Sequence, residues 1–416
     1  MTPWPLIPSA ARFRPRITAG EHLATLGSLL FDTNPQDGTR QARLESALAR
    51  RLGVADGATL LTPHARVAIY LAVKSLLQEG RQTVILSPYT IPDVVNMVVC
   101  AGGIPRFLDI DPTTCDLDRQ AVQAVMNDAT GAILVTHLFG MGSDVSDLAA
   151  ACREKGIALI ENAAQAFGVV VNGRAVGTMG DAGVFSFGLG SALSALCGGM
   201  LVTPHPRVRS HAGAVLAFFP WMERANLLGR AGEALLLDLV TWPWLFKLGS
   251  YWLVRPWLDR MALEKCDVTL RSAFPEKLAR RMTPMQAQLL LGKIEGVDAE
   301  MRTRIANARR YHAGLSGLPG LRLPPMREDG SHGYPHFSVQ CEEREALLRH
   351  LGRARRDIAL PSLVNCAAHP CFKEYAVPCP NAATIANQTL LLPTYPGYAP
   401  AEIDRNIEVI RGFSLR

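Results

Sequence analysis

The sequence predicts an α/β fold: a mostly parallel sheet with helices on both faces, plus a smaller C-terminal α+β domain. Three observations predict it. Apolar runs of strand length recur between residues 83 and 203, helical stretches separate several of them, and the pattern changes near residue 300. Repeated strand–helix–strand order is typical of parallel sheets. The 416 residues, 48% of them hydrophobic, suffice to bury a large core.

Six short apolar runs are predicted to be strands. They are TVILS (83–87), IPRFLDI (104–110), AILVTH (132–137), IALIE (157–161), GVFSF (183–187) and GMLVT (199–203). Helices are predicted over 65–80 and 144–156. Ligands of parallel sheets bind at the carboxyl ends of the strands, so we expect the loops there to converge on one pocket. The loops concerned follow Ser87, His137, Glu161 and Phe187.

The change of pattern near residue 300 predicts a domain boundary. A polar helix is expected over 296–315, and it leads into a unit with the strand-like run HFSVQ and a Pro-rich stretch. We therefore assign residues 1–300 to a large α/β domain and residues 301–416 to a small C-terminal domain.

Composition and charge narrow the class of protein. The net charge is +6, but the basic residues are scattered apart from clusters such as RARR (353–356), which disfavours nucleic-acid binding. Nine cysteines without a Cys-x-x-Cys pair favour free thiols in a reducing cytoplasm. The N-terminus does not have the pattern of a signal peptide, and no run has the uncharged length needed to span a bilayer.

Several segments share a resemblance to one enzyme family. The longest is THLFGMGSDVSDLAAACREKGIALIENAAQAFGVVVNGRAVGTMGDAGVFSF (136–187). It resembles the central segment of the DegT/DnrJ/StrS sugar aminotransferases, fold-type I enzymes that use pyridoxal phosphate (PLP). Residues 102–118, 280–315 and 388–410 resemble other family segments, so the likeness covers about residues 20–205 and 270–412. The resemblance implies the PLP-transferase fold and an active site shared across a dimer.

The resemblance also places a serine where the family has its essential lysine. In FSFGLGSALSALCGG (185–199) that place holds Ser191, and no gap allows the alignment to slide. A hydroxyl cannot form the Schiff base with the PLP aldehyde that a lysine amine forms. The nearest lysines in sequence are Lys155, on a predicted helix, and Lys247. We therefore expect no covalently bound cofactor and no Schiff-base catalysis.

A second departure concerns the strand end ENAAQ (161–165). The family has an aspartate at the position of Asn162, and by resemblance that carboxylate keeps the pyridine nitrogen protonated. Asparagine is neutral and can only hydrogen-bond. Gln165, which by resemblance faces the ring hydroxyl, and Ser186, which matches a phosphate-binding serine, are retained.

Further departures affect the rest of the predicted pocket. Ala65 and Arg66 replace the family's Gly-Thr pair at a helix start, and Ile91 replaces its stacking aromatic residue. Where the family has an asparagine contributed by the neighbouring subunit, this chain has Ala279. Where the family has a glutamate before the glycine pair, this chain has Cys197. A helix N-terminus still attracts anions, although the close approach that glycine allows is lost. The degenerate pocket is predicted to comprise Ala65, Arg66, Ile91, His137, Asn162, Gln165, Ser186 and Ser191.

Residues 210–265 form an apolar insert that contains five of the six tryptophans. Its leucine and alanine residues at four-residue spacing predict an apolar helix stripe, with the charged Asp238 elsewhere on the turn and Pro243 breaking the helix. The stripe residues are Leu227, Ala231, Leu235 and Leu239. A second apolar piece is expected up to Pro256. Tryptophans beside Lys and Arg suit a membrane interface. The alternative is a helical hairpin packed on its own domain or on a second subunit.

A cysteine–histidine cluster raises the question of a metal. Cys366, Cys371, Cys379 and His369 lack zinc spacing, because CAAHPC contains no C-x₂-C pair. The segment resembles a family loop that already carries a histidine. We expect a structural role and no metal.

The residues together predict a non-catalytic or repurposed homologue in amino-sugar or surface-glycan biosynthesis. It would act as a partner or ligand-binding subunit, in a homodimer or in a heterodimer with an active homologue, with a nucleotide sugar as a candidate ligand. One alternative is an active nucleotide-sugar aminotransferase or dehydratase that holds PLP or pyridoxamine phosphate (PMP) non-covalently. Another is a peripheral membrane scaffold that uses residues 210–265 at the inner face of the membrane.

Overall fold

The central feature of the computed structural model is a seven-stranded sheet. The structure describes residues 8–15, 17–31, 38–264 and 269–413; residues 1–7, used in the signal-peptide prediction, and residue 265, the end of the predicted insert, lie outside these ranges. The strand order is β1-β10-β9-β6-β5-β2-β4. The strands are β1 (Thr59–Thr62), β2 (Thr83–Leu86), β4 (Ile104–Phe107), β5 (Thr130–Thr136), β6 (Ala158–Asn162), β9 (Ala182–Ser186) and β10 (Gly199–Val202). Only β10 runs antiparallel to its neighbours in this sheet, which confirms the mostly parallel prediction.

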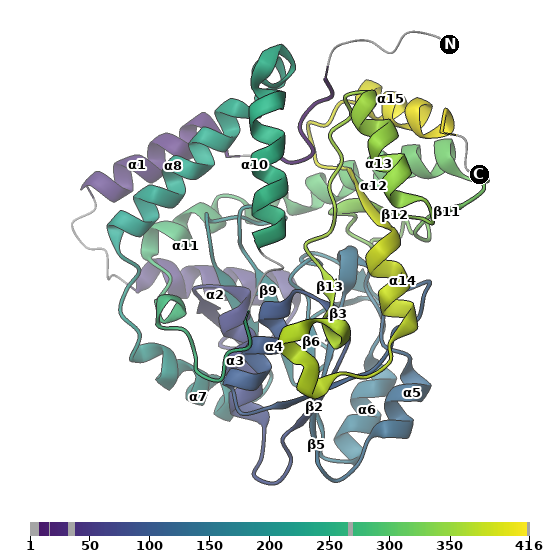
Figure 1. Cartoon of the computed structure of the whole chain (residues 1–416). Coiled ribbons are helices and arrows are strands. Elements are labelled where there is room, and N and C mark those ends of the chain that lie inside the picture. Colours follow the sequence, from purple (N-terminus) through teal and green to yellow (C-terminus); the bar gives the residue numbers. More distant parts are fainter. Residues whose placement is uncertain (1–7, 16, 32–37, 265–268, 414–416) are drawn as a thin grey trace.

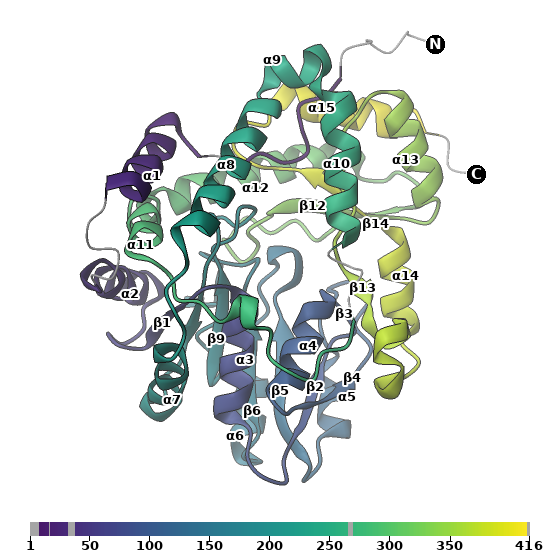
Figure 2. The same ribbon diagram turned by 60° about the vertical axis from the view of Figure 1, so that its left-hand side comes forward.

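Helices cover both faces of this sheet (Figures 1 and 2). One core contains α3 (Ala65–Leu76), α4 (Pro92–Cys100) and α7 (Pro206–Ala217). The core on the other face contains α2 (Thr39–Leu52), α5 (Arg119–Val125), α6 (Ser146–Glu154) and α11 (Pro284–Leu291). Successive residues of β5 alternate between the two cores, because side chains along a strand point to opposite faces. Both faces of the strands are therefore buried, which explains their continuous apolar runs.

Two predicted elements end earlier than the sequence suggested. The helix predicted over 65–80 stops at Leu76, because Leu77 is extended and Gln78 and Arg81 then form a β-bridge. The strand predicted over 104–110 ends at Phe107. Apolar content continues beyond both ends, but hydrophobicity by itself does not specify where backbone pairing stops.

The C-terminal unit has its own three-stranded sheet, ordered β11-β12-β14. Its elements are β11 (Leu321–Arg322), β12 (His336–Cys341), β14 (Thr389–Pro393), α12 (Val297–Leu315), α13 (Arg344–Arg353), α14 (Pro380–Gln388) and α15 (Pro400–Arg411). A separate core joins this sheet to α12, α13 and α15. The predicted boundary at 300/301 falls inside α12, which starts on the large core at Val297 and continues on the small core from Ile305. The start of the chain also packs here, because Arg12 N donates to Asp357 Oδ2 at 2.9 Å.

The insert consists of three helices that lie near α1 (Ala19–Phe31) and the C-terminal unit (Figure 2). They are α8 (Arg224–Val240), the short α9 (Pro243–Leu245) with a π-helical turn over Phe246–Ser250, and α10 (Tyr251–Glu264). Pro243 starts α9, as its fixed φ favours. Pro256 lies inside α10 instead of ending it, so the predicted end of the second apolar piece was wrong.

The predicted stripe on α8 is only partly buried. Leu227 and Ala231 are buried, but Leu235 and Leu239 are exposed. A four-residue spacing advances about 40° beyond a full turn at each step, because a helix has about 3.6 residues per turn. The buried face therefore continues through Ala234, Leu237 and Asp238.

Asp238 was predicted to lie away from the buried face, and this was wrong. The carboxylate is buried, and its Oδ2 lies 2.9 Å from His22 Nε2 of α1. Arg14 Nε lies 3.7 Å from Oδ1. The N-terminal segment that supplies both partners is more than 200 residues away in sequence, so helix periodicity on α8 could not reveal them.

The corrected face of α8 predicts that truncating one of two neighbouring leucines destabilises the fold and that truncating the other hardly does. Leu237 is 2% exposed and Leu236 is 54% exposed. We expect Leu237→Ala to lower the free energy of unfolding by about 2–5 kcal/mol, because it leaves a cavity. Leu236→Ala, the matched control, should change it by no more than about 0.5 kcal/mol. Urea denaturation of both variants measures this; equal losses would contradict the assigned face.

Candidate functional site

The carboxyl edge of the sheet brings the predicted pocket residues together on neighbouring loops. β1 leads into the N-terminus of α3, and the start of β10 passes so close that a Cβ on Gly199 would lie 2.4 Å from Ala65 N. His137 follows β5, and its N–H donates to Asn162 O at the end of β6 at 3.0 Å. The connection from Phe187 to Gly198 closes on itself, since Phe187 N donates to Gly198 O at 3.0 Å.

Ser191 lies in this loop close to the predicted phosphate-binding serine. Its Oγ is 3.1 Å from Ser186 Oγ, and both residues are half-buried. Gly188 N also donates to Ser186 Oγ, at 3.4 Å. Hydroxyl groups can exchange hydrogen bonds with each other and with an anion, but they supply no amine. Of the two nearest lysines in sequence, Lys155 is exposed beyond α6 and Lys247 Nζ lies 2.6 Å from Glu402 Oε1.

The loop is fixed from behind by α11. Gln286 Nε2 donates to Cys197 O at 2.8 Å, and its Oε1 accepts from Thr283 N at 3.0 Å in a capping box at the helix start. Leu193 and Ala195 are fully buried, and Leu196 adopts a left-handed φ of 67°. The departures from the family motif thus lie in a well-packed loop.

Asn162 has a partner within its own loop, whereas Gln165 is bonded to the neighbouring loop after β5. Asn162 is buried, and its Oδ1 accepts from Ala164 N at 3.3 Å. Gln165 is exposed, and its Oε1 accepts from Phe139 N at 2.7 Å. Phe139 has a left-handed φ of 54°, and its ring is tilted by 59° to that of Tyr89, with ring centroids 6.3 Å apart. A neutral amide at Asn162 can donate or accept a hydrogen bond but cannot hold a proton on a ring nitrogen by charge.

His137 faces a buried carboxylate. Its Nε2 is 3.0 Å from Glu161 Oε2, and its Nδ1 accepts from Ser143 N at 3.3 Å. With Nδ1 accepting, Nε2–H is the donor to Glu161. The backbone N–H groups of Gly177, Met179 and Gly180 donate to the same carboxylate at 2.8, 2.6 and 2.7 Å.

The Glu161 carboxylate therefore accepts hydrogen bonds that hold the fold together. Burial would raise its pKa, but the hydrogen bonds from His137 and the backbone outweigh burial and hold the pKa below the usual value. Both ring nitrogens of His137 are engaged as well. Of the predicted pocket residues, His137 thus serves to join β5, β6 and the turn before β9.

Arg66 is paired with a neighbouring acid. Its Nη1 forms a short ion pair with Asp93 Oδ2, and Arg271 Nη1 lies 2.8 Å from Asp93 Oδ1. Ile91, at the predicted stacking position, is half-buried and caps α4 two residues before Asp93. Arg66 and Arg271 thus share one carboxylate, which balances only part of the charge that Arg66 could offer to a phosphate.

Two basic residues at this edge, His64 and Arg230, were not among the predicted pocket residues. His64 precedes α3, and burial, together with the charges of Arg66 and Arg230, lowers its pKa to about 3. Burial raises the pKa of the Cys197 thiol, and the charge of Arg230 opposes this rise. His64 directly precedes the Ala65–Arg66 pair that was named from the sequence. Nothing in the sequence could place Arg230 here, because it belongs to the insert helix α8.

The cysteine–histidine cluster forms local contacts. His369 Nδ1 lies 3.0 Å from Cys371 Sγ, and Cys366 Sγ donates to Thr90 O at 3.7 Å. Within the described ranges, no group of three or more His, Cys, Asp or Glu side chains is arranged to hold a metal ion. Likewise, no helix among the described residues is long and apolar enough to cross a membrane.

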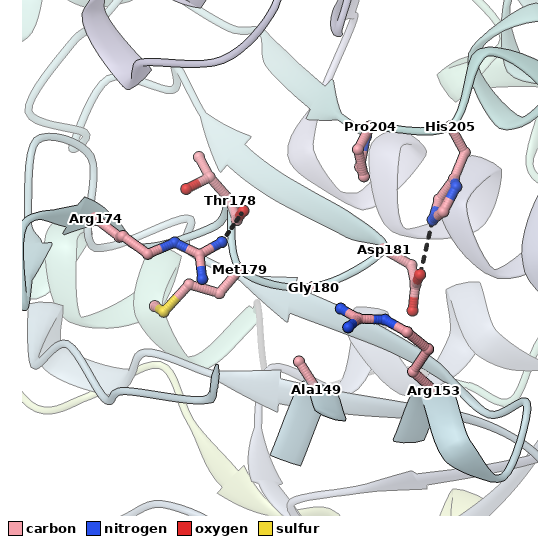
Figure 3. Close-up of a pocket in the computed structure, with 9 residues that line it drawn as sticks. All are labelled: Ala149, Arg153, Arg174, Thr178, Met179, Gly180, Asp181, Pro204 and His205. Atoms are coloured by element: carbon pink, nitrogen blue, oxygen red, sulfur yellow. Dashed lines mark hydrogen bonds and ion pairs between the residues drawn. The ribbon is translucent and has the colours of Figure 1, made fainter. Parts of the chain in front are cut away.

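Two adjoining cavities lie at the opposite, amino edge of the sheet. The smaller, of about 210 Å³, lies between the end of α6, the start of β9 and the end of β10 (Figure 3). Across it, His205 Nε2 lies 2.7 Å from Asp181 Oδ1, and Asp181 Oδ2 accepts from Leu159 N at 2.8 Å. The larger, of about 630 Å³, shares Thr178, Gly180 and Pro204 with it. Both are separated by the sheet from the predicted cofactor pocket.

Comparison with known sequences gives consistent relatives. The sequence profile described as the DegT/DnrJ/EryC1/StrS aminotransferase family matches residues 19–218 and 277–411. The chain is 25% identical over 357 residues to the spore coat polysaccharide biosynthesis protein SpsC of Bacillus subtilis, covering 83% of this chain and 82% of SpsC. It is 26% identical over 410 residues to the UDP-N-acetyl-3-dehydro-alpha-D-glucosamine 3-aminotransferase of Acidithiobacillus ferrooxidans, covering 98% and 97%.

Solved structures agree on the fold. The aminotransferase TlmJ from Streptoalloteichus hindustanus superposes with a TM-score of 0.77 at 22% identity, covering 97% of this chain and 98% of that one. The fold is thus that of the aminotransferases, as predicted. The family profile is interrupted between residues 218 and 277, where this chain carries α8 to α10.

Proposed function

We propose, from the premise that this chain belongs to the DegT/DnrJ/EryC1/StrS aminotransferase family, that it is a non-catalytic or repurposed member. It would serve as a partner or ligand-binding subunit in the biosynthesis of amino sugars or surface glycans. The relatives support the pathway class, because one is a spore coat polysaccharide biosynthesis protein and another aminates a nucleotide sugar.

The observation that carries the proposal is the Ser191–Ser186 contact of 3.1 Å, at the position where the family resemblance expects a lysine. PLP contributes an aldehyde that a lysine amine captures, and the conjugated ring then withdraws electrons. The side chains of this edge do not fit a covalently held PLP: Ser191 has no amine, and Asn162 has no charge to place at a ring nitrogen.

The proposed subunit works as a dimer, either with itself or with an active homologue. Sites shared across a dimer allow a subunit without its own lysine to complete or regulate its neighbour's site. We place it in the reducing cytoplasm, a proposal that the eight described cysteines support, because no disulfide joins any of them.

A second candidate is an active nucleotide-sugar aminotransferase or dehydratase that holds PLP or PMP without a covalent bond. The observation that favours it is the grouping of Arg66, Arg230 and the α3 N-terminus around His64. A helix N-terminus and arginines attract phosphate. Under this candidate, titration with PMP and an amino acceptor would change the absorption spectrum of the bound cofactor.

The assay that tests the proposal uses the purified chain alone. With PLP, glutamate and a nucleotide-linked keto sugar, we expect no amino sugar above the no-protein background, because no side chain at the edge can capture the aldehyde. The aminotransferase of A. ferrooxidans, assayed in parallel on its own substrate, is the positive control. Turnover by this chain alone would refute the non-catalytic assignment, and a change in the rate or elution of a co-expressed homologue would support the partner role.

A further inference from the structure

The insert carries a group of exposed apolar side chains at one end of the molecule. We define the apolar tip as Trp244 and Leu245 of α9, Leu248 of the π-helical turn, and Trp252 and Leu253 of α10. Their exposed fractions are 75, 47, 82, 60 and 79%. Figure 2 shows α9 at the end of the molecule opposite α6 and α7.

The tip is not the packing face of the insert. The inward side of the same turns buries Phe246, Tyr251 and Val254, which form a small core with Ala11. The Phe246 and Tyr251 rings meet edge to face with centroids 5.7 Å apart. The hairpin is therefore anchored through one side, and its outer apolar side chains are not needed to hold it in place.

Exposed charge is absent from this part of the insert. Between Leu235 and Leu253 the sequence contains two charged residues, Asp238 and Lys247. Asp238 is buried against His22, and Lys247 Nζ lies 2.6 Å from Glu402 Oε1. The exposed side chains next to the tip on α8, Leu236 and Leu239, extend the same apolar surface.

Arginines border the apolar surface. The guanidinium of Arg14 lies 5.0 Å from the Trp242 ring centroid, and that of Arg355 lies 5.4 Å from the Trp252 ring centroid. Indole rings stacked with cations, beside exposed apolar side chains, match the region of a bilayer where acyl chains meet headgroups. Anionic headgroups complement the guanidinium groups.

We propose that the apolar tip docks this protein on the surface of an anionic lipid bilayer. The tip would bury Trp244, Leu248 and Leu253 at the headgroup boundary, while Arg355 beside Trp252 meets lipid phosphates. A second copy of this surface fits less well, because residues 235–253 would offer it no free carboxylate for the bordering arginines: their one acidic residue, Asp238, is buried against His22. The family profile omits residues 219–276. The apolar tip therefore belongs to this chain's insert, and the docking proposal does not depend on the proposed function.

Vesicle flotation with the full chain tests the proposal. We expect the protein to float with vesicles of phosphatidylcholine and phosphatidylglycerol, to float less with phosphatidylcholine alone, and to be released by salt. Leu248→Glu/Leu253→Glu should reduce the bound fraction about tenfold or more, because two carboxylates would enter the boundary. Phe218→Glu is the matched control, since Phe218 is 89% exposed at the end of α7, away from the tip. It should bind as the parent does.

Two further readouts separate the outcomes. Brominated lipids should quench tryptophan fluorescence of the parent and of the Phe218→Glu variant but not of the tip variant, whose circular dichroism should match the parent's. Equal flotation of the parent and the tip variant would overturn the proposal. Failure of the parent to bind anionic vesicles would also overturn it. The same holds if the parent binds no vesicles and forms a dimer in solution, while the tip variant is a monomer.

Discussion

The double variant Ser191→Lys/Asn162→Asp is expected to bind PLP covalently, whereas the parent chain does not. Lysine at 191 restores an amine in the loop between β9 and β10, close to Ser186, and aspartate at 162 restores a charge at the end of β6. The amine is what captures the aldehyde, and the carboxylate stabilises the protonated ring. The loop is packed against Gln286 and already ordered, so the new side chain needs no refolding of its surroundings.

Borohydride reduction followed by peptide mass spectrometry measures this capture directly. We expect a phosphopyridoxyl group at residue 191 in the double variant, less of it in Ser191→Lys, and none in Asn162→Asp. Exposed Lys155 and Lys373 report background labelling, which should be equal in all proteins. A parent chain labelled at any lysine above that background would contradict the predicted loss of Schiff-base chemistry.

Glu161→Ala is expected to be the most destabilising single change near the site. The fully buried carboxylate accepts hydrogen bonds from His137 and from three backbone N–H groups. Removing it leaves those donors buried without an acceptor, at a cost on the order of 3–5 kcal/mol in the free energy of unfolding. Glu161→Gln should cost less, because its amide oxygen still accepts. Urea denaturation provides the values, and Glu154→Gln at the exposed end of α6 is the matched control.

The same carboxylate predicts the direction of the pH dependence. Its folded pKa lies below 4.5, the ordinary pKa of a glutamate, because the hydrogen bonds from His137 and the backbone outweigh burial. The stability that it contributes is therefore fully present above about pH 4.5 and is lost as the pH falls through the lowered folded pKa. The difference in unfolding free energy between the parent and Glu161→Gln should shrink in acid. A difference that stays constant down to pH 3 would show that ionisation of Glu161 does not stabilise the fold.

The sequence by itself determined the fold class, because strand–helix–strand alternation is a local pattern that repeats along the chain. It also determined the chemistry absent at residues 162 and 191, since an amide or hydroxyl cannot be converted to a carboxylate or an amine by folding. The strand runs ending near Ser87, His137, Asn162 and Phe187 were visible for the same reason.

Only the tertiary structure decided how the remaining polar groups are used. It paired His137 with Glu161, Arg66 with Asp93 and Asp238 with His22, and it brought Arg230 of the insert close to His64. Two of these pairs join different helices, Arg66–Asp93 linking α3 to α4 and Asp238–His22 linking α8 to α1, and the partners of Asp238 are more than 200 residues away in sequence. Charge pairing depends on distances in space, whereas periodicity reports only which face of one element is buried. For α8, a four-residue spacing did not follow even that face.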